Sequence, residues 1–388
     1  MVSLPVVKSL SLQVSRLLKG AAVAERIFLG HLPCFILSQS PCPELVIALK
    51  RQRRHQDRRR LSKLNTILES VYDDISDSMS IQSSSRVVNI DDYPKRDVII
   101  HLTGGGFLAH TIAGDVPFLL DWSSKCQAVV LIPEYSLLPD HVFPAALEEI
   151  SHLYVGLRKG VYITSLGFQP NKIIVTGESS GGNLGAALCV KLCEDSWNNI
   201  AVPSVFDQYS MRLSEREQLN LGEVSSPVKQ QDTSTIRIEM PDAIMFCCPM
   251  LNLSSCLSPS RIFGKSDPIL PSSLLRAISD AYIPSKEMKE STLSSEVDRP
   301  EVPHYEVVDD SGRSWQDARK NPLVSPLFAS DHVLKCFPPT LLYGSSEDPF
   351  LDDSVVFNAR LRSLGVDSEL RATRHMAHAF WGLGKYHI

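Results

Sequence analysis

Short aliphatic segments alternate with helical patterns along most of this chain, and the alternation restricts its fold more than any other feature of the sequence. The aliphatic segments are DVIIHL at 97–102, AVVLIP at 128–133, KIIVTG at 172–177, DAIMFCC at 242–248, PPTLLYG at 338–344 and SELRAT at 368–373. Helical patterns lie at 142–158, 181–194 and 352–364. Short strands that alternate with helices are typical of a mostly parallel sheet with helices on both faces. The sequence therefore predicts an α/β protein whose principal domain is formed by residues 97–388.

Two polar stretches interrupt the alternation, and we expect both to be insertions, at 196–240 and 254–320. The second contains a helical pattern, SSLLRAISDAY at 272–282, followed by a serine-rich part at 285–314 that we expect to be disordered. Residues 65–96 are expected to form a linker. Helices of the basic segment 1–64, together with the second insertion, are candidates for a cap over a pocket.

The first 64 residues are strongly basic, with 12 Lys and Arg against 3 Asp and Glu, although the whole chain has a net charge of −5. The tract KRQRRHQDRRR at 50–60 fits three interpretations: a solvated helix face, contact with an anionic lipid surface, or a nuclear-import signal. Residues 1–24 have the spacing of an amphipathic helix and also faintly resemble a transit peptide. We expect a cytoplasmic protein, with peripheral contact with membranes or lipid droplets, or organelle targeting, as alternatives.

The nine cysteines have irregular spacing, with no C-x-x-C pair and no zinc-type cluster. They predict reduced thiols rather than a disulfide scaffold or a metal site. No apolar run reaches the length of about 18 residues that a membrane-spanning helix needs. We expect no cofactor, no metal and no nucleic-acid partner, and the sequence predicts no particular protein partner.

GESSG at 177–181 fits the G-x-S-x-G pattern of a nucleophilic serine, Ser179. The pattern alone is weak, because a serine in a glycine-rich turn also matches it. Its position strengthens it, since it ends the strand-like segment 172–177 and precedes a helical pattern. Such a sharp turn lifts the hydroxyl above the sheet and points the positive end of the helix at developing negative charge. Ser179 is therefore the candidate nucleophile.

A nucleophilic serine needs a base, and the base needs a carboxylate to orient it. Asp348 and His378 each follow a later predicted strand, in the order Ser, Asp, His that this layout uses. His375 is an alternative base. Alternative acids are Glu347, Asp352 and Asp353, of which the last two are better placed to cap a helix. A metal bound by the two histidines is less favoured, because no third ligand is near in the sequence.

Attack on a carbonyl also requires hydrogen-bond donors for the oxyanion that forms. TGGGF at 103–107 follows the first clear strand, and its glycines let backbone N–H groups turn toward a substrate. A phosphate-binding loop is the alternative, but neither G-K-[ST] nor G-x-G-x-x-G is present there. We expect the donors to be the backbone amides of Gly105, Gly106 and Ser180.

Six motifs occur in a characteristic order: TGGGF, EYSLLPDHVFPAALEE, GESSGGNL, NPLVSPLFASD, DPFLDD and MAHAF. Over about residues 97–384 they resemble the hormone-sensitive-lipase branch of the α/β-hydrolases. The resemblance implies a serine carboxylic-ester hydrolase, an esterase or lipase acting on acyl esters or neutral lipids. It assigns the nucleophile to Ser179, the acid to Asp348 and the base to His378, and a cap would then limit acyl length.

The chain departs from the family pattern at three positions. Thr103 stands where the family has a histidine that braces the glycine loop, Glu178 replaces an Asp, and Ser180 replaces an Ala. An alternative is a non-catalytic small-molecule hormone receptor on the same fold, for which Thr103 is the one supporting feature; such receptors lack the base, whereas His378 is present. A scaffold acting through the basic tract is a third hypothesis, but it leaves the ordered serine, acid and histidine unexplained.

Overall fold

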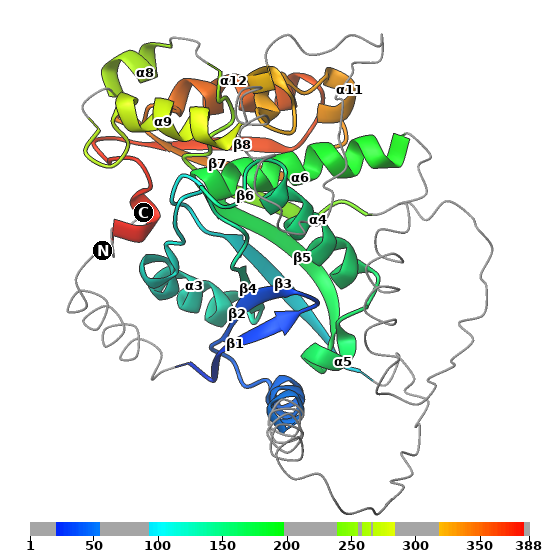
Figure 1. Cartoon of the computed structure of the whole chain (residues 1–388). Coiled ribbons are helices and arrows are strands. Elements are labelled where there is room, and N and C mark those ends of the chain that lie inside the picture. The colour runs from blue at the N-terminus through cyan, green and yellow to red at the C-terminus, as the bar shows by residue number, and fades with distance from the viewer. Residues whose placement is uncertain are drawn as a thin grey trace, which may run out of the picture.

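A single twisted sheet organises the computed structural model, which describes residues 21–54, 93–197, 239–254, 258–264, 267–283 and 318–383 (Figure 1). Its strands are β1 (Val23–Leu29), β2 (Leu32–Ser38), β3 (Lys95–Leu102), β4 (Val129–Pro133), β5 (Gln169–Glu178), β6 (Ala243–Cys247), β7 (Thr340–Ser345) and β8 (Ser368–Thr373). The sheet order is β1-β2-β4-β3-β5-β6-β7-β8. Pairing is parallel from β4 to β8 and antiparallel at β1/β2 and β2/β4. All six aliphatic segments are strands, and the predicted α/β class is confirmed.

Helices cover both faces of this sheet. They are α3 (Ile112–Cys126), α4 (Ala145–Arg158), α5 (Ile163–Leu166), α6 (Ser180–Trp197), α8 (Pro259–Phe263), α9 (Ser272–Tyr282), α11 (Asp331–Leu334) and α12 (Leu351–Ser363), with a further helix over residues 43–54 and 3-10 helices η5 (Ala318–Lys320), η6 (Pro326–Phe328) and η7 (Phe380–Leu383). Successive strand residues point to opposite faces. Val98 and Ile100 accordingly join the larger core with α4 and α6, whereas Ile99 joins the smaller core under α3.

Residues 23–38 differ from the expectation of a separate basic segment with cap helices. They form β1 and β2, and β2 pairs with β4 along residues 34–37. Leu37 packs under α3, while Cys34 and Ile36 face the larger core. Pro33 causes no break, because it lies near the start of β2, where a missing N–H is tolerated. This part of the N-terminal region is therefore a sheet edge.

The helix at residues 43–54 does not lie where it could cover a pocket at the carboxyl ends of the strands. Arg96 Nε, at the start of β3, donates to Glu44 Oε1 at 2.6 Å, and Gln52 Nε2 donates to the Ser165 carbonyl at 3.4 Å. These contacts lie at the amino ends of parallel strands, beside α5 (Figure 1). Ligand sites of such sheets form at the opposite, carboxyl ends. The basic residues 50–54 therefore lie far from that edge, and the rest of the tract 50–60 lies outside the described residues.

The described part of the second insertion contains α8 and α9, and the helix predicted at 272–282 is confirmed as α9. Both helices lie at the carboxyl edge of the sheet, close to α12 (Figure 1). Most of the first insertion, most of the linker at 65–96 and the stretch 285–314 lie outside the described residues.

Eight of the nine cysteines are described, and all eight are free thiols. Six of them are buried. Within the described ranges, none of the helices combines the length and the apolar character that crossing a membrane requires.

Candidate active site

Ser179 sits on a tight turn between β5 and α6. Its φ of 55° lies in the left-handed region, which is rare for a residue with a side chain and common at strained functional turns. Neither flanking glycine has room for a side chain. A Cβ on Gly177 would lie 2.6 Å from the Gly181 carbonyl oxygen, and a Cβ on Gly181 would lie 2.0 Å from the Leu102 carbonyl oxygen. This geometry places the Ser179 hydroxyl at the carboxyl edge of the central strand.

Ser179, His378 and Asp348 form a continuous hydrogen-bonded chain. His378 Nδ1 lies 2.9 Å from Asp348 Oδ1, and His378 Nε2 lies 2.7 Å from Ser179 Oγ. A carboxylate can only accept, so Nδ1 carries the proton and Nε2 accepts from the serine hydroxyl. All three side chains are buried. The structure thus brings together the three residues that the sequence pointed to, each from the end of a different strand.

The charge of His378 depends on its neighbours. Burial lowers the pKa of this imidazole, but the nearby Asp348 carboxylate outweighs burial and holds the pKa well above its usual 6.5. The Asp348 carboxylate thereby favours the imidazolium that forms when the ring takes a proton. This is the electrostatic arrangement that a general base needs.

The alternative residues lie elsewhere. His375 is exposed and its Nδ1 is 3.5 Å from Glu347 Oε1. Asp352 accepts the backbone N–H of Ser260, and Asp353 forms an ion pair with Arg261. None of these contacts involves Ser179 or His378.

The glycine loop at 103–106 lies directly against the turn that carries Ser179. A Cβ on Gly104 would lie 3.5 Å from the Ser179 Cβ. Gly105 and Gly106 have φ values of 118° and 64°, which favour glycine. Space also excludes side chains, because a Cβ on Gly105 would lie 2.2 Å from the Ala109 carbonyl oxygen. The loop therefore needs its glycines both for conformation and for close packing.

Thr103 belongs to a hydrogen-bond network that braces the glycine loop. The histidine in this network is His110, which lies seven positions after Thr103 in the sequence. Thr103 Oγ1 lies 3.0 Å from His110 Nδ1, and His110 Nε2 lies 3.0 Å from the Tyr135 carbonyl oxygen. That carbonyl can only accept, so Nε2 carries the proton and the threonine hydroxyl donates to Nδ1. Burial lowers the pKa of His110, which agrees with a neutral ring. Tyr135 completes the brace by donating its hydroxyl to the Thr103 carbonyl at 2.7 Å.

Replacing Thr103 by Val is expected to lower kcat by about 3- to 10-fold, because one buried hydrogen bond is typically worth about 0.5–1.5 kcal/mol and a tenfold rate change is about 1.4 kcal/mol. Val keeps the size of the side chain but leaves His110 Nδ1 without its donor. Thr103→Ser keeps the hydroxyl and serves as the matched control. Steady-state hydrolysis of p-nitrophenyl butyrate measures both variants, and equal rates for Val and Ser would contradict the bracing role.

Glu178, immediately before Ser179, is buried and accepts the backbone N–H of Trp381 at 3.1 Å. Burial and the nearby Asp115 raise the pKa of this carboxyl to about 8. The side chain is therefore mostly protonated at neutral pH. Its contact ties the turn that carries the serine to the loop that carries His378.

Two residues that support the site, His110 and Asp267, were not predicted from the sequence. His110 lies seven positions after Thr103, and its only sequence signal is the departure at Thr103 itself. Asp267, in the second insertion, accepts the backbone N–H of His378 at 2.8 Å. No sequence motif points to it, since its partner is a backbone group more than 100 residues further along the chain.

Cys248, Asp348 and His378 are the one group of potential metal ligands in the described ranges, with ligand atoms within 4.8 Å of one another. Both nitrogens of His378 are already engaged by Asp348 and Ser179. Burial holds the pKa of the Cys248 thiol well above its usual 9.0, whereas a metal requires the thiolate. The donor set as it stands therefore suits proton transfer better than metal binding.

A serine, a histidine and an aspartate that meet beside a glycine loop, at the carboxyl edge of a mostly parallel sheet, have the layout of the serine hydrolases. The chain belongs to the family with the alpha/beta hydrolase fold, whose sequence profile matches residues 99–305 and 305–382.

Among curated proteins, the chain is 25% identical to hormone-sensitive lipase of Mus musculus, over 74% of this chain and 51% of that protein. It is 23% identical to an esterase of Gibberella moniliformis, over 73% of this chain and 66% of that protein. The resemblance to hormone-sensitive lipases is thus confirmed. The chain spans about half the length of the mouse lipase that it matches.

Solved structures with a similar fold include carboxyl esterase 2 from Tuber melanosporum, with a TM-score of 0.55 and 15% identity, covering 94% of this chain and 78% of that one. Another is the HSL homologue EstE7 from a metagenome library, with a TM-score of 0.51 and 16% identity, covering 96% and 84%. At this level of identity the likeness shows the fold alone.

Proposed function

We propose that the protein is a serine carboxylic-ester hydrolase that works through an acyl-enzyme. The observation that carries the proposal is the continuous chain from Ser179 Oγ through the His378 ring to Asp348, with separations of 2.7 and 2.9 Å. His378 takes the serine proton as the oxygen attacks the ester carbonyl, and Asp348 stabilises the imidazolium. The imidazolium then protonates the leaving alcohol. Water then attacks the acyl-enzyme while His378 takes a proton from the water. His378 returns this proton to the Ser179 oxygen as the carboxylic acid is released.

The oxyanion would be bound by the backbone amides of Gly105, Gly106 and Ser180. Support comes from the packing of the 103–106 loop against Ser179 and from the left-handed glycines. Ser180 is the first residue of α6, an 18-residue helix whose amino end favours negative charge. Loss of one such donor typically lowers turnover by about 10²–10³.

Acyl esters, including neutral lipids, are the proposed substrate class. The similarity to curated hormone-sensitive lipases and esterases supports this class. Hydrolysis of p-nitrophenyl esters of increasing acyl length, compared with an acylglycerol emulsion, tests it. Hydrolysis of at least one series is expected, and inactivity toward all of them would overturn the proposal. The non-catalytic receptor is less well supported, because His378 contacts Ser179 and Thr103 is explained by its bond to His110.

Activity should rise with pH through the pKa of His378. Only the neutral ring can accept the serine proton, and the pKa of His378 lies above 6.5. The acid limb of kcat/KM is therefore expected to have its midpoint above pH 6.5. Replacing Asp348 by Asn removes the charge that raises this pKa, so the midpoint should move to lower pH. A pH profile of p-nitrophenyl butyrate hydrolysis measures both, and a midpoint below 6.5 in the wild type would contradict the assignment.

A further inference from the structure

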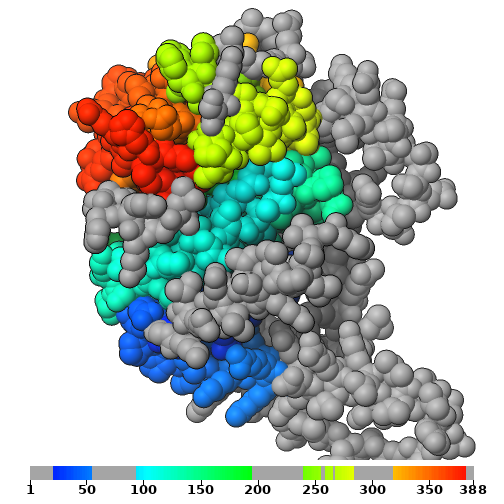
Figure 2. Space-filling view, turned by 90° about the vertical axis from the view of Figure 1, so that its left-hand side faces the viewer, coloured from blue at the N-terminus to red at the C-terminus, as the bar shows by residue number. Residues whose placement is uncertain are grey.

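The second insertion contacts two of the loops that carry the site, the one that follows Asp348 and the one that contains His378. Figure 2 shows residues of this insertion, in yellow and yellow-green, packed between the red C-terminal segment and the cyan surface of the domain. These residues lie far from the loops in the sequence, so the contacts are purely tertiary. We define the insertion clamp as residues 258–264 and 267–270.

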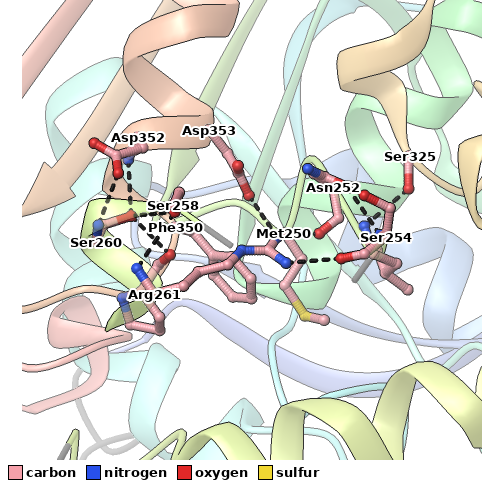
Figure 3. A network of polar contacts seen from close by, with 12 residues as sticks. Met250, Asn252, Ser254, Ser258, Ser260, Arg261, Ser325, Phe350, Asp352 and Asp353 are labelled. Carbon is pink, nitrogen blue, oxygen red and sulfur yellow. Dashed lines mark hydrogen bonds and ion pairs between the residues drawn. The ribbon is translucent and has the colours of Figure 1, made fainter. Parts of the chain in front are cut away.

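The first half of the clamp binds the loop that follows Asp348. Ser260 donates its hydroxyl to the Pro349 carbonyl at 3.0 Å, and its backbone N–H to Asp352 Oδ2 at 2.7 Å (Figure 3). The Asp352 N–H in turn donates to the Ser260 hydroxyl at 3.2 Å. A Cβ on Gly264 would lie 3.0 Å from the Pro349 Cα, so the end of α8 packs tightly on the same loop.

Arg261 reinforces this half. Its Nη2 donates to Asp353 Oδ2 at 2.9 Å, and its Nη1 to the Ser254 carbonyl at 2.9 Å (Figure 3). The guanidinium lies over the Phe350 ring, 5.7 Å from its centroid. The Phe350 ring also packs against the imidazole of His378 in a T-shaped arrangement, with 5.4 Å between centroids. The clamp therefore reaches both the acid loop and the ring that packs on the base.

The second half of the clamp binds the base directly. Asp267 is buried, and its Oδ2 accepts the His378 backbone N–H at 2.8 Å. Its Oδ1 accepts the backbone N–H groups of Ile269 and Leu270, both at 2.8 Å. One carboxylate therefore joins the turn of the insertion to the peptide that carries the catalytic imidazole.

The loop around His378 needs such an anchor. His375 and Ala379 on either side have φ values of 59° and 57°, in the left-handed region that non-glycine residues rarely adopt. A strained backbone persists only where surrounding contacts hold it. Asp267 supplies one of these contacts at the base itself, and Glu178 supplies another at Trp381.

We propose that the insertion clamp is part of the positioning machinery of the site, with Asp267 as the positioning residue for His378 and Ser260 and Arg261 as those for the Asp348 loop. This inference rests on the proposed hydrolase function and adds a role to an insertion that the sequence suggested only as a cap. A displacement of about 1 Å at a catalytic group can lower rates by about 10²-fold. The clamp contacts the loops of the acid and the base, so its loss should lower kcat more than it changes KM.

The test compares Asp267→Asn with Asp280→Asn in the full chain. Asp280 lies on α9 of the same insertion, is about half exposed and forms an ion pair with Arg319, so it gives the same chemical change away from His378. Asparagine at 267 cannot accept at both of its terminal atoms. We expect Asp267→Asn to lower kcat about 10- to 100-fold, with KM within about twofold, and Asp280→Asn to leave both near wild type.

A second readout is the rate at which a fluorophosphonate labels Ser179, which reports the reactivity of the serine without an ester substrate. This rate is expected to fall with kcat in Asp267→Asn. Equal kcat and labelling rates in Asp267→Asn and Asp280→Asn would overturn the clamp. A wild type that neither hydrolyses esters nor becomes labelled would instead overturn the proposed function on which the clamp rests.

A folding defect in Asp267→Asn, detected by circular dichroism, would transfer the test to Ser260→Ala. This variant removes the hydroxyl that binds the Pro349 carbonyl and the Asp352 N–H, while the backbone bond to Asp352 is kept. We expect a fall in kcat of about 3- to 10-fold with KM retained, from the usual worth of a buried hydrogen bond. Unchanged kcat in folded Ser260→Ala would then overturn the clamp.

Discussion

Replacing Ser179 by Ala is expected to lower kcat for p-nitrophenyl butyrate by a factor on the order of 10⁶ while the protein remains folded. The hydroxyl is the one group in the proposed mechanism that bonds covalently to the substrate. Ala is smaller and fits the turn, although its φ of 55° keeps the backbone strained. The residual rate would reflect oxyanion binding alone.

Ser363→Ala, at the exposed end of α12, is the matched control for this change. It is expected to retain wild-type turnover. Thermal unfolding followed by circular dichroism should give similar midpoints for both variants. Turnover of Ser179→Ala within tenfold of the Ser363 control would show that another group is the nucleophile.

Replacing Asp348 by Asn should lower kcat by about 10⁴ with little change in the shape of the site. Asp348 Oδ1 accepts from His378 Nδ1 at 2.9 Å and from the Phe350 N–H at 3.1 Å. A neutral amide no longer stabilises the imidazolium, and its NH₂ group favours the tautomer with the proton on Nε2. That tautomer cannot accept the proton of Ser179.

Asp121→Asn provides the same change on the exposed face of α3, where Asp121 pairs with Lys125. It is expected to leave kcat unchanged. Steady-state kinetics with p-nitrophenyl butyrate distinguish the two variants. An Asp348→Asn enzyme with more than a tenth of wild-type kcat would mean that a different carboxylate supports His378.

The sequence predicted the parallel part of the sheet because its strands are short, aliphatic and separated by helical patterns. It did not predict β1 and β2, whose apolar residues merge into one run that prolines interrupt. Helix α3 was also missed. Pro117 lies inside it, and Asp115 and Ser123 on its buried side weaken the apolar pattern.

The central candidate residues could be proposed from the sequence because each follows a strand, and parallel strands present their carboxyl ends at one edge. Supporting residues such as His110 and Asp267 could not. Each acts through a backbone carbonyl or N–H, and backbone groups carry no sequence signal. Thr103 indicated only that the family's bracing histidine is missing from this position. The structure shows that His110 contacts Thr103 instead.

Anionic-lipid contact through residues 1–64 stays a prediction. Apart from Arg26 on β1, the described Lys and Arg residues of this region lie at 50–54, on a helix at the amino ends of the strands. A lipid surface that contacts them would therefore lie on the side of the molecule opposite Ser179.

Ser179 is identified as the nucleophile most directly by mapping the covalent adduct of a fluorophosphonate by mass spectrometry of the digested protein. We expect a single adduct on the peptide that contains Ser179, at one label per chain, and none in Ser179→Ala. No adduct on the wild type, or an adduct on another residue that persists in Ser179→Ala, would show that Ser179 is not the nucleophile.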